Sequence, residues 1–304
     1  MNVPDGYVFR HPGPDEAAAV AELMTIADAD SEEEFTADDI AREWRSLDLD
    51  RDVWVVDAPE GGLAAAVATW SRDGAIVSSD GYVHPSHTGR GLGKSLLELT
   101  EEHARGLVGG PATVQSGTLA SNAAALALFD TRGYAPVRHF FRMVIELERE
   151  PPAPQWPPGL EPRAFDPLDA AAFHAAVEEA FADEFGHVPE TFEAWRARRV
   201  EAPEATLDLW LAVWDGDEIA ATLMCDRERF GMGWIGSVGV REPWRRRGLG
   251  LALLHHAFGE FWRLGQHRVA LGVDAENPTG ATRLYERAGM RVLFDYVLFE
   301  KRLA

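Results

Sequence analysis

The sequence predicts an α/β protein of two tandem domains, each with a central mixed β-sheet flanked by helices. A unit of similar sequence occurs twice, and in both copies strand and helix candidates alternate around a glycine-rich segment. A stretch at 149–160 separates the copies, and its five prolines are incompatible with a helix or a central strand. We therefore expect domains at residues 1–150 and 151–304, joined by a semi-rigid linker.

Two pairs of matching segments reveal the duplication. VHPSHTGRGLGKSLL at 83–97 corresponds to VREPWRRRGLGLALL at 240–254, an offset of 157 residues. ALFDTRGY at 127–134 corresponds to RLYERAGM at 283–290, an offset of 156 residues. The matches have the same order and nearly the same spacing, which indicates a tandem duplication.

The expected elements follow one order in both copies, from apolar periodicity and turn residues. In the first copy they are helices at 14–28 and 36–46 and strands at 53–57, 63–70 and 76–83, followed by a helix after the glycine-rich segment and a strand at 113–117. In the second copy they are helices at 167–183 and 190–200 and strands at 207–215, 218–225 and 234–241, followed by a helix after the glycine-rich segment and a strand at 268–274. Each copy is then expected to end in another short helix and a final β-hairpin.

Composition excludes several classes of protein. The chain has 304 residues and a net charge of −21, a sign that repels nucleic acid and anionic lipid. No apolar run approaches the roughly 18 residues that cross a bilayer, and the N-terminus lacks the pattern of a secretion signal. One cysteine cannot form an internal disulfide. We expect a cytoplasmic protein, monomer or homodimer, without nucleic-acid or membrane partners.

The glycine-rich segment Arg245–Gly250 lies where a strand becomes a helix. Glycine permits positive φ and close approach of a ligand to the main chain. Amides at a helix N-terminus can then hold a pyrophosphate, and three arginines add positive charge. The spacing of a Walker loop and that of a Rossmann fingerprint are both absent.

The motif R-x-x-G-x-G, following V-x-V at Val238–Val240, resembles the acetyl-CoA-binding motif of the GCN5-related N-acetyltransferase (GNAT) superfamily. The segment from Asn277 to Met290 resembles that superfamily's signature of asparagine, tyrosine and glycine. The likeness covers nearly the whole chain, once per copy, in a tandem layout similar to that of mycothiol synthases. It implies two GNAT-type domains with mostly antiparallel sheets.

The resemblance implies a function and a set of residues. It implies acetyl transfer from acetyl-CoA, as cosubstrate and without a metal, to a primary amine of a small molecule by direct attack. Tyr285 would protonate the departing thiolate, and a main-chain N–H near Val238 would stabilise the oxyanion. The residues implied to bind the donor are Val238, Gly239, Val240, Arg245, Arg246, Arg247, Gly248, Leu249, Gly250, Asn277 and Tyr285.

The two copies differ where chemistry is expected. In the first copy Thr88 stands at the position of Arg245, and Phe129, which has no proton to give, at that of Tyr285. We therefore expect catalysis in the second domain and a degenerate first domain, so that a fragment ending near Pro151 has no activity. The general base is less determined, and Glu184 and Glu228 are the catalytic candidates.

An acidic run follows the first expected helix, including Asp28, Asp30 and Glu33. It is either a solvated loop or a subsite for a cationic acceptor. Two further functional alternatives stay open: a non-catalytic acyl-CoA-binding or regulatory module, and an acyltransferase that takes its acyl group from aminoacyl-tRNA.

Overall fold

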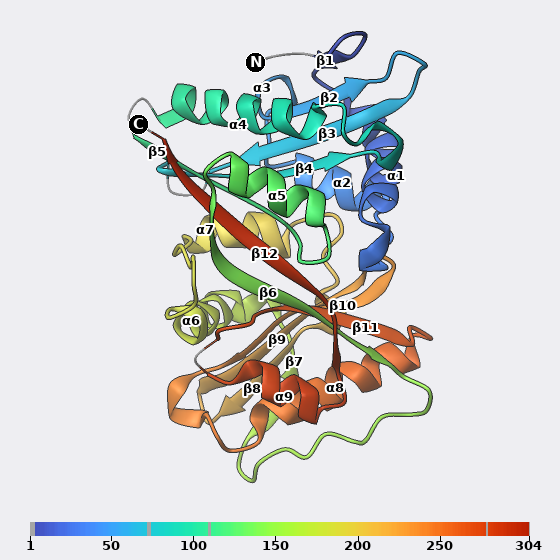
Figure 1. Cartoon of the computed structure of the whole chain (residues 1–304). Helices are drawn as coiled ribbons and strands as arrows, with labels where there is room; N and C mark the ends of the chain where they lie inside the picture. Colours follow the sequence, from blue (N-terminus) through green and yellow to red (C-terminus); the bar gives the residue numbers. More distant parts are fainter. Residues whose placement is uncertain (1–3, 72–73, 109–110, 278, 304) are drawn as a thin grey trace. The chain divides into compact units, whose positions relative to one another are not determined.

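The computed structural model describes residues 4–71, 74–108, 111–277 and 279–303. The chain forms two compact units (Figure 1). Unit 1 comprises Met1–Phe140 and Phe294–Ala304, and unit 2 comprises Phe141–Leu293. Each unit combines a mixed sheet with helices in the same order, which confirms the predicted α/β class and its tandem organisation.

Unit 1 contains most elements of the first sequence copy. They are β1 (Val8–Arg10), a 3-10 turn (Pro14–Glu16), α1 (Ala17–Ala27), a 3-10 turn (Ala29–Ser31), α2 (Ala37–Trp44), α3 (Leu49–Asp52), β2 (Val53–Asp57), β3 (Leu63–Trp70), β4 (Ile76–Val83), a 3-10 turn (Pro85–His87), α4 (Leu92–Val108), β5 (Ala112–Leu119) and α5 (Ala123–Thr131). Its sheet has the order β1-β2-β3-β4-β5-β12, and only β4 and β5 are paired in parallel among the printed registers of this unit.

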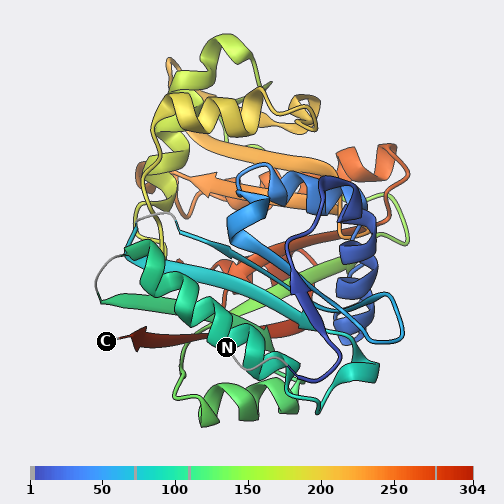
Figure 2. The same ribbon diagram turned by 90° about the horizontal axis from the view of Figure 1, so that it is seen from above.

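Alternation along the strands decides which helix covers which face of this sheet. Val55 and Ala66 pack with α1 and α2, whereas Val56 and Ala65, their direct neighbours, pack with α4. Successive side chains of a strand point to opposite faces, so one sheet builds two apolar layers. Figure 2 views this unit from above, with α1 and α4 separated by the strands.

The last strand of unit 1 comes from the C-terminal end of the chain. β12 (Arg291–Leu303) pairs antiparallel with β5, from Tyr296 opposite Leu119 to Leu303 opposite Ala112, as the dark red strand of Figure 1 illustrates. Phe299 of β12 stacks on Phe129 with ring centroids 4.6 Å apart. The apolar core around α5 is therefore closed by residues from the second sequence copy.

β6 (Ala135–Glu146) runs in the other direction, from unit 1 into unit 2 at Phe141. Met143 of β6 is completely buried in the core of unit 2. The expected domains 1–150 and 151–304 thus follow the two sequence copies, whereas in the compact units the last strand of each copy belongs mainly or partly to the other unit. The ranges 1–150 and 151–304 remain a prediction about the two copies of the sequence.

Unit 2 repeats the order of elements. They are β7 (Glu161–Ala164), a 3-10 turn (Pro167–Asp169), α6 (Ala170–Phe181), α7 (Phe192–Trp195), a π-helical turn (Arg196–Val200), a 3-10 turn (Leu207–Leu209), β8 (Leu211–Asp215), β9 (Glu218–Arg229), β10 (Met232–Val240), a 3-10 turn (Glu242–Trp244), α8 (Leu249–Arg263), β11 (Arg268–Asp274) and α9 (Ala281–Arg287). Its sheet has the order β6-β11-β10-β9-β8-β7. Alternation again separates two cores, since Val213 packs with α8 and Ala212 with α6.

The structure corrects one prediction about the fold. Each copy was expected to end in a β-hairpin, but each ends in a single long strand, β6 or β12. Residues 135–146 contain no glycine, asparagine or aspartate that would favour a tight turn, so the strand continues. Residues 149–160 form neither helix nor strand, as their prolines predict.

Candidate active site

The parallel strands β10 and β11 of unit 2 pair only near their beginning. Gly233 is opposite Val269 and Trp234 is opposite Ala270, and the printed register between these strands goes no further. β10 also has a register shift against β9 between Ile235 and Ser237, the mark of a β-bulge. A bulge interrupts the ladder and re-aims the following residues. The predicted donor-binding segment Val238–Val240 lies directly after it.

The glycine-rich segment leads into α8. Gly248 has φ +91° and Arg246 has φ +61°, so the chain bends sharply before the helix. The amide of Ala252 bonds to the carbonyl of Gly248, and the amides before it, including those of Leu249 and Gly250, are at the helix N-terminus, where no intrahelical acceptor exists. Such amides attract an anion.

The three arginines of this segment have different roles. Arg245 turns back to the protein: its Nε donates to the carbonyl of Val240 at 3.0 Å, and its Nη2 donates to the carbonyl of Ala180 at 3.2 Å. It therefore ties the loop to the end of β10 and to α6. Arg246 and Arg247 are exposed beside the start of α8. Arg245 is half-buried by comparison.

Two of the predicted donor-binding glycines have a packing reason of their own. A Cβ at Gly239 would lie 2.8 Å from Oγ1 of Thr222 and 3.2 Å from the Cβ of Ala180. A Cβ at Gly250 would lie 2.7 Å from a methyl carbon of Leu284 in α9. Gly248 is different, because a Cβ there would meet nothing within 4 Å. Its surroundings are open, as a ligand site requires.

Three predicted residues come together at the C-terminal end of β11. Asn277, in the turn before α9, donates from Nδ2 to Oε1 of Glu184 at 3.3 Å. Its own side-chain oxygen accepts from the amide of Thr279 at 2.9 Å, which orients the carboxamide. Tyr285 lies in α9 and is only 8% exposed. Glu184, in the segment between α6 and α7, is close enough to Tyr285 to affect its ionisation.

Burial and charge perturb both acidic groups of this cluster. Partial burial and the neighbouring Asp274 carboxylate raise the pKa of Glu184, while His187 lowers it to a smaller extent. Burial, with a contribution from Glu184, raises the pKa of Tyr285 to about 12. The phenol therefore stays protonated throughout the neutral range. A carboxylate shifted upward is a suitable proton acceptor near neutral pH.

Glu228 lies elsewhere. It is exposed near the end of β9, where that strand is paired with the first residues of β10. Among the described residues no hydrogen bond or ion pair connects Glu228 with Glu184, Asn277 or Tyr285. Its role as a base stays a prediction.

Unit 1 has a similar loop in the corresponding place. Gly89 and Gly91, which align with Arg246 and Gly248, have φ +74° and +89°. β4 and β5 pair from Ile76 to Ser79 and then separate. In contrast to β10, β4 pairs with β3 in one continuous register from Ser78 to Val83. Unit 1 thus keeps the loop and the separation of the strands, and its register against β3 has no shift.

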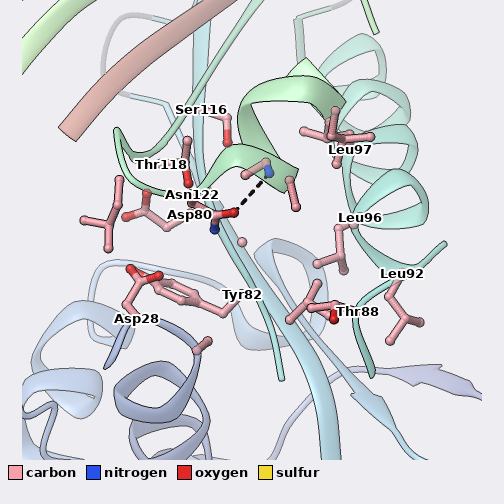
Figure 3. Close-up of a pocket in the computed structure, with 18 of the residues that line it drawn as sticks. Asp28, Asp80, Tyr82, Thr88, Leu92, Leu96, Leu97, Ser116, Thr118 and Asn122 are labelled. Carbon is pink, nitrogen blue, oxygen red and sulfur yellow. Dashed lines mark hydrogen bonds between the residues drawn. The ribbon is translucent and has the colours of Figure 1, made fainter. Parts of the chain in front are cut away.

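A pocket of about 770 Å³ lies where β4 and β5 separate, and every residue that lines it belongs to unit 1 (Figure 3). Asp80 and Tyr82 of β4, Asp28 after α1 and Tyr296 of β12 form one polar part of its lining. Asp28 belongs to the acidic run of the sequence, whereas the other three residues were not predicted to be functional. No local pattern distinguishes them, and only the pairing of β12 with β5 brings Tyr296 there.

Comparison with known proteins decides the family. A model of the acetyltransferase (GNAT) family matches residues 20–134 and 145–290, once per sequence copy. The chain belongs to this family. Mycothiol acetyltransferase of Thermomonospora curvata is 34% identical over 223 residues, which cover 71% of this chain and 71% of that protein. Mycothiol acetyltransferase of Corynebacterium efficiens is 28% identical over 265 residues, covering 80% and 83%.

Solved structures agree with this assignment to the GNAT family. A GCN5-related N-acetyltransferase from Sphaerobacter thermophilus is 41% identical with a TM-score of 0.86, over 99% of this chain and 97% of that one. A tandem GNAT protein from the clavulanic acid biosynthesis pathway has a TM-score of 0.74 at 18% identity, over 97% and 98%, and supports the fold alone. The protein is therefore an N-acetyltransferase with two GNAT domains. None of its described helices is both long and apolar enough to cross a membrane.

Proposed function

We propose that unit 2 transfers the acetyl group of acetyl-CoA directly to a primary amine of a small molecule. The observation that carries the proposal is the hydrogen bond from Asn277 to Glu184, with Tyr285 beside them. The bond holds the Glu184 carboxylate at the turn before α9, the helix that carries the Tyr285 phenol, although the two segments are far apart in the chain. These are the two kinds of group that direct acetyl transfer needs, one to accept a proton and one to donate it.

The donor would bind along β10 and at the start of α8. The pantetheine arm pairs with main-chain groups after the bulge, near Val238 and Val240, as an added strand. The pyrophosphate lies at the amides of Arg247 to Gly250, where the helix N-terminus and two exposed guanidinium groups favour an anion. A main-chain N–H near Val238 stabilises the negative oxygen that forms on the thioester carbonyl.

The proton balance releases one proton to solvent. The substrate ammonium loses a first proton to Glu184, which passes it to solvent, and the nitrogen then attacks the thioester carbonyl. As the C–N bond forms, the nitrogen loses its second proton to Glu184, and as the C–S bond breaks, the sulfur takes the phenolic proton of Tyr285. The proton held by Glu184 then restores the phenol. The pKa of about 12 keeps Tyr285 in its donor form before the reaction.

Unit 1 is proposed not to catalyse this reaction. Phe129 stands where unit 2 has Tyr285, and it packs on Phe299 in the apolar core. The continuous register of β4 also leaves unit 1 without the bulge that precedes Val238. These differences support the proposal that only unit 2 combines a donor site and an acceptor site for catalysis.

The acceptor is a small amine, and the relatives suggest where to begin. Several proteins with 28–34% identity are named mycothiol acetyltransferase, so the unacetylated precursor of mycothiol is the first amine to test. Polyamines, amino acids and amino sugars complete the panel. Release of the CoA thiol with each amine is the measurement.

The test compares the wild type with Glu184→Gln and Glu228→Gln. We expect thiol release with at least one amine and a fall in kcat of about 10²-fold or more in Glu184→Gln, the scale for losing a general base. Glu228→Gln tests the other candidate for the general base. If this variant loses activity and Glu184→Gln does not, the base is Glu228. Thiol release that no amine stimulates, in a folded protein, would contradict the proposed function.

A further inference from the structure

Glu184 and His187 lie at the two ends of one tight turn in the segment between α6 and α7. The amide of His187 donates to the carbonyl of Glu184 at 3.1 Å, and Gly186 between them has φ +71°. A turn of this kind brings the Cα atoms of its first and fourth residues within about 7 Å. The proposed general base therefore has a titratable imidazole as a close neighbour.

The two ends of this turn are attached to different parts of unit 2. Nε2 of His187 lies 3.3 Å from a carboxylate oxygen of Glu178, near the end of α6. Oε1 of Glu184 accepts a hydrogen bond from Nδ2 of Asn277, in the turn before α9. The turn therefore links α6 to the residues before α9, and the place of Glu184 depends on both contacts.

The contact between His187 and Glu178 is partly shielded from solvent. The two side chains are 18% and 24% exposed. Attraction between opposite charges is screened less at such a site than on an open surface. Glu178 also lies 3.7 Å from Nε2 of His174, but that ring packs against Phe192 and Trp195 of α7. His187 is the histidine of this group that shares a turn with Glu184.

The charges around Glu184 come from three directions. Burial, followed by the carboxylate of Asp274 at the end of β11, raises the pKa of Glu184, and His187 lowers it. Tyr285 of α9 adds no charge at neutral pH, because its own pKa is about 12. Of the groups in the described chain that affect the ionisation of Glu184, the imidazole of His187 favours its carboxylate form.

We propose that His187, held by Glu178 of α6, is a positioning residue for the general base, and that its imidazolium ion keeps Glu184 as the carboxylate that accepts the proton of the substrate. The inference rests on the proposed acetyl transfer in unit 2, in which Glu184 accepts a proton twice in each turnover. Histidine side chains gain a proton between about pH 8 and pH 5. The effect of His187 is therefore largest in the acidic part of this range and fades as pH rises.

The test measures kcat/KM from pH 5.5 to 9 for the amine of the panel that gives the most thiol release. His187→Gln removes the charge and keeps a side chain that can donate to Glu178, whereas His187→Arg is cationic at every pH. The matched control is His256→Gln, which removes an imidazole that lies 3.7 Å from Glu260 in α8. The ratio of each variant to the wild type cancels the ionisation of the substrate amine. Thermal unfolding of each variant establishes that it is folded.

The ratio for His187→Gln should be near 1 at pH 9 and about 3- to 10-fold lower at pH 6. The reason is that loss of a neighbouring positive charge moves the titration of Glu184 upward by about 0.5 to 1 pH unit. His187→Arg should keep a ratio near 1 at pH 6, and His256→Gln should do so at every pH. A loss of the same size at every pH in His187→Gln, as a purely structural role would produce, or no loss at pH 6, would overturn the proposal.

The side-chain carboxyl carbon of Glu184 provides a readout that does not depend on turnover. Carbon-13 NMR of the labelled full chain follows this signal, which is assigned by its absence in Glu184→Gln. Its titration midpoint should move upward in His187→Gln and not in His187→Arg, and an unchanged midpoint in His187→Gln would overturn the proposal.

The same variants separate this inference from the proposed function. A shifted midpoint in a protein without amine-stimulated thiol release would support the charge effect of His187 and contradict the acetyl transfer. Normal kcat in Glu184→Gln would overturn the role of His187 and leave the acetyl transfer standing.

Discussion

Asp28→Asn should stabilise the protein at alkaline pH, although it removes a charged group. The pKa of Asp28 rises from an ordinary value of 3.8 to about 7 in the folded chain, because of burial and three neighbouring carboxylates. Between these two values the folded state holds a proton that the unfolded state has lost. The wild type therefore loses stability as pH rises from about 4 to about 7, and the loss is complete above that range.

The size of the effect follows from the shift. Three pKa units at about 1.36 kcal/mol each give an upper limit of roughly 4 kcal/mol at pH 8. Asp28 keeps partial contact with solvent, which reduces the repulsion, so we expect about half, or ~2 kcal/mol. Asparagine has nearly the same shape and no charge, so Asp28→Asn should gain this free energy at pH 8 and almost none at pH 4.

Urea unfolding of the wild type and Asp28→Asn at pH 4, 5, 6, 7 and 8 is the assay, followed by circular dichroism and tryptophan fluorescence. The control is Asp30→Asn, which removes an exposed carboxylate two residues away. Because this variant keeps Asp28, its stability should fall between pH 4 and pH 7 nearly as much as that of the wild type. If Asp28→Asn is no more stable than the wild type at pH 8, or is less stable by a constant amount at every pH, the reasoning is wrong.

Three other predictions concern the donor site, the proton donor and the exchanged strand. Tyr285→Phe should lower kcat about 10²-fold with little change in thermal stability, because the ring stays in the core. The control Tyr134→Phe removes a buried hydroxyl of unit 1 and should leave kcat unchanged. A normal kcat in Tyr285→Phe would mean that water protonates the thiolate. Gly248→Val should raise the KM for acetyl-CoA at least 10-fold, whereas Gly265→Val, with a similar positive φ of +75° against +91°, should not; equal KM values would exclude this loop as the pyrophosphate site. Deleting the chain from Phe294 onward should unfold unit 1, because β5 loses its neighbour β12 and the core loses Phe299; an unchanged far-UV circular dichroism signal and melting temperature would contradict this. A fragment ending near Pro151 lacks the same strand, so its inactivity would not distinguish a degenerate site from an unfolded unit.

The sequence by itself determined the duplication, the order of the elements and the glycine-rich loop before α8. These features depend on local patterns: apolar periodicity sets a helix or strand, and a glycine with positive φ is needed where a strand turns into a helix. The likeness to the GNAT family also came from short motifs around Gly248 and Tyr285, and the family comparison confirmed it. The loop of unit 1 has positive φ at the same two positions, although Gly89 stands there in place of Arg246, and the aligned spacing predicts this correspondence.

Only the tertiary structure decided which distant residues meet. Glu184 contacts Asn277 across 93 residues, and Tyr296 contacts Asp80 across 216 residues. The second contact exists because the last strand pairs with β5 and not within its own sequence copy. Both copies end in a strand of similar length and alternation, so the pattern of either strand fits the edge of either sheet. Which strand closes which unit depends on the packing of whole units, and that choice created the acidic pocket of unit 1.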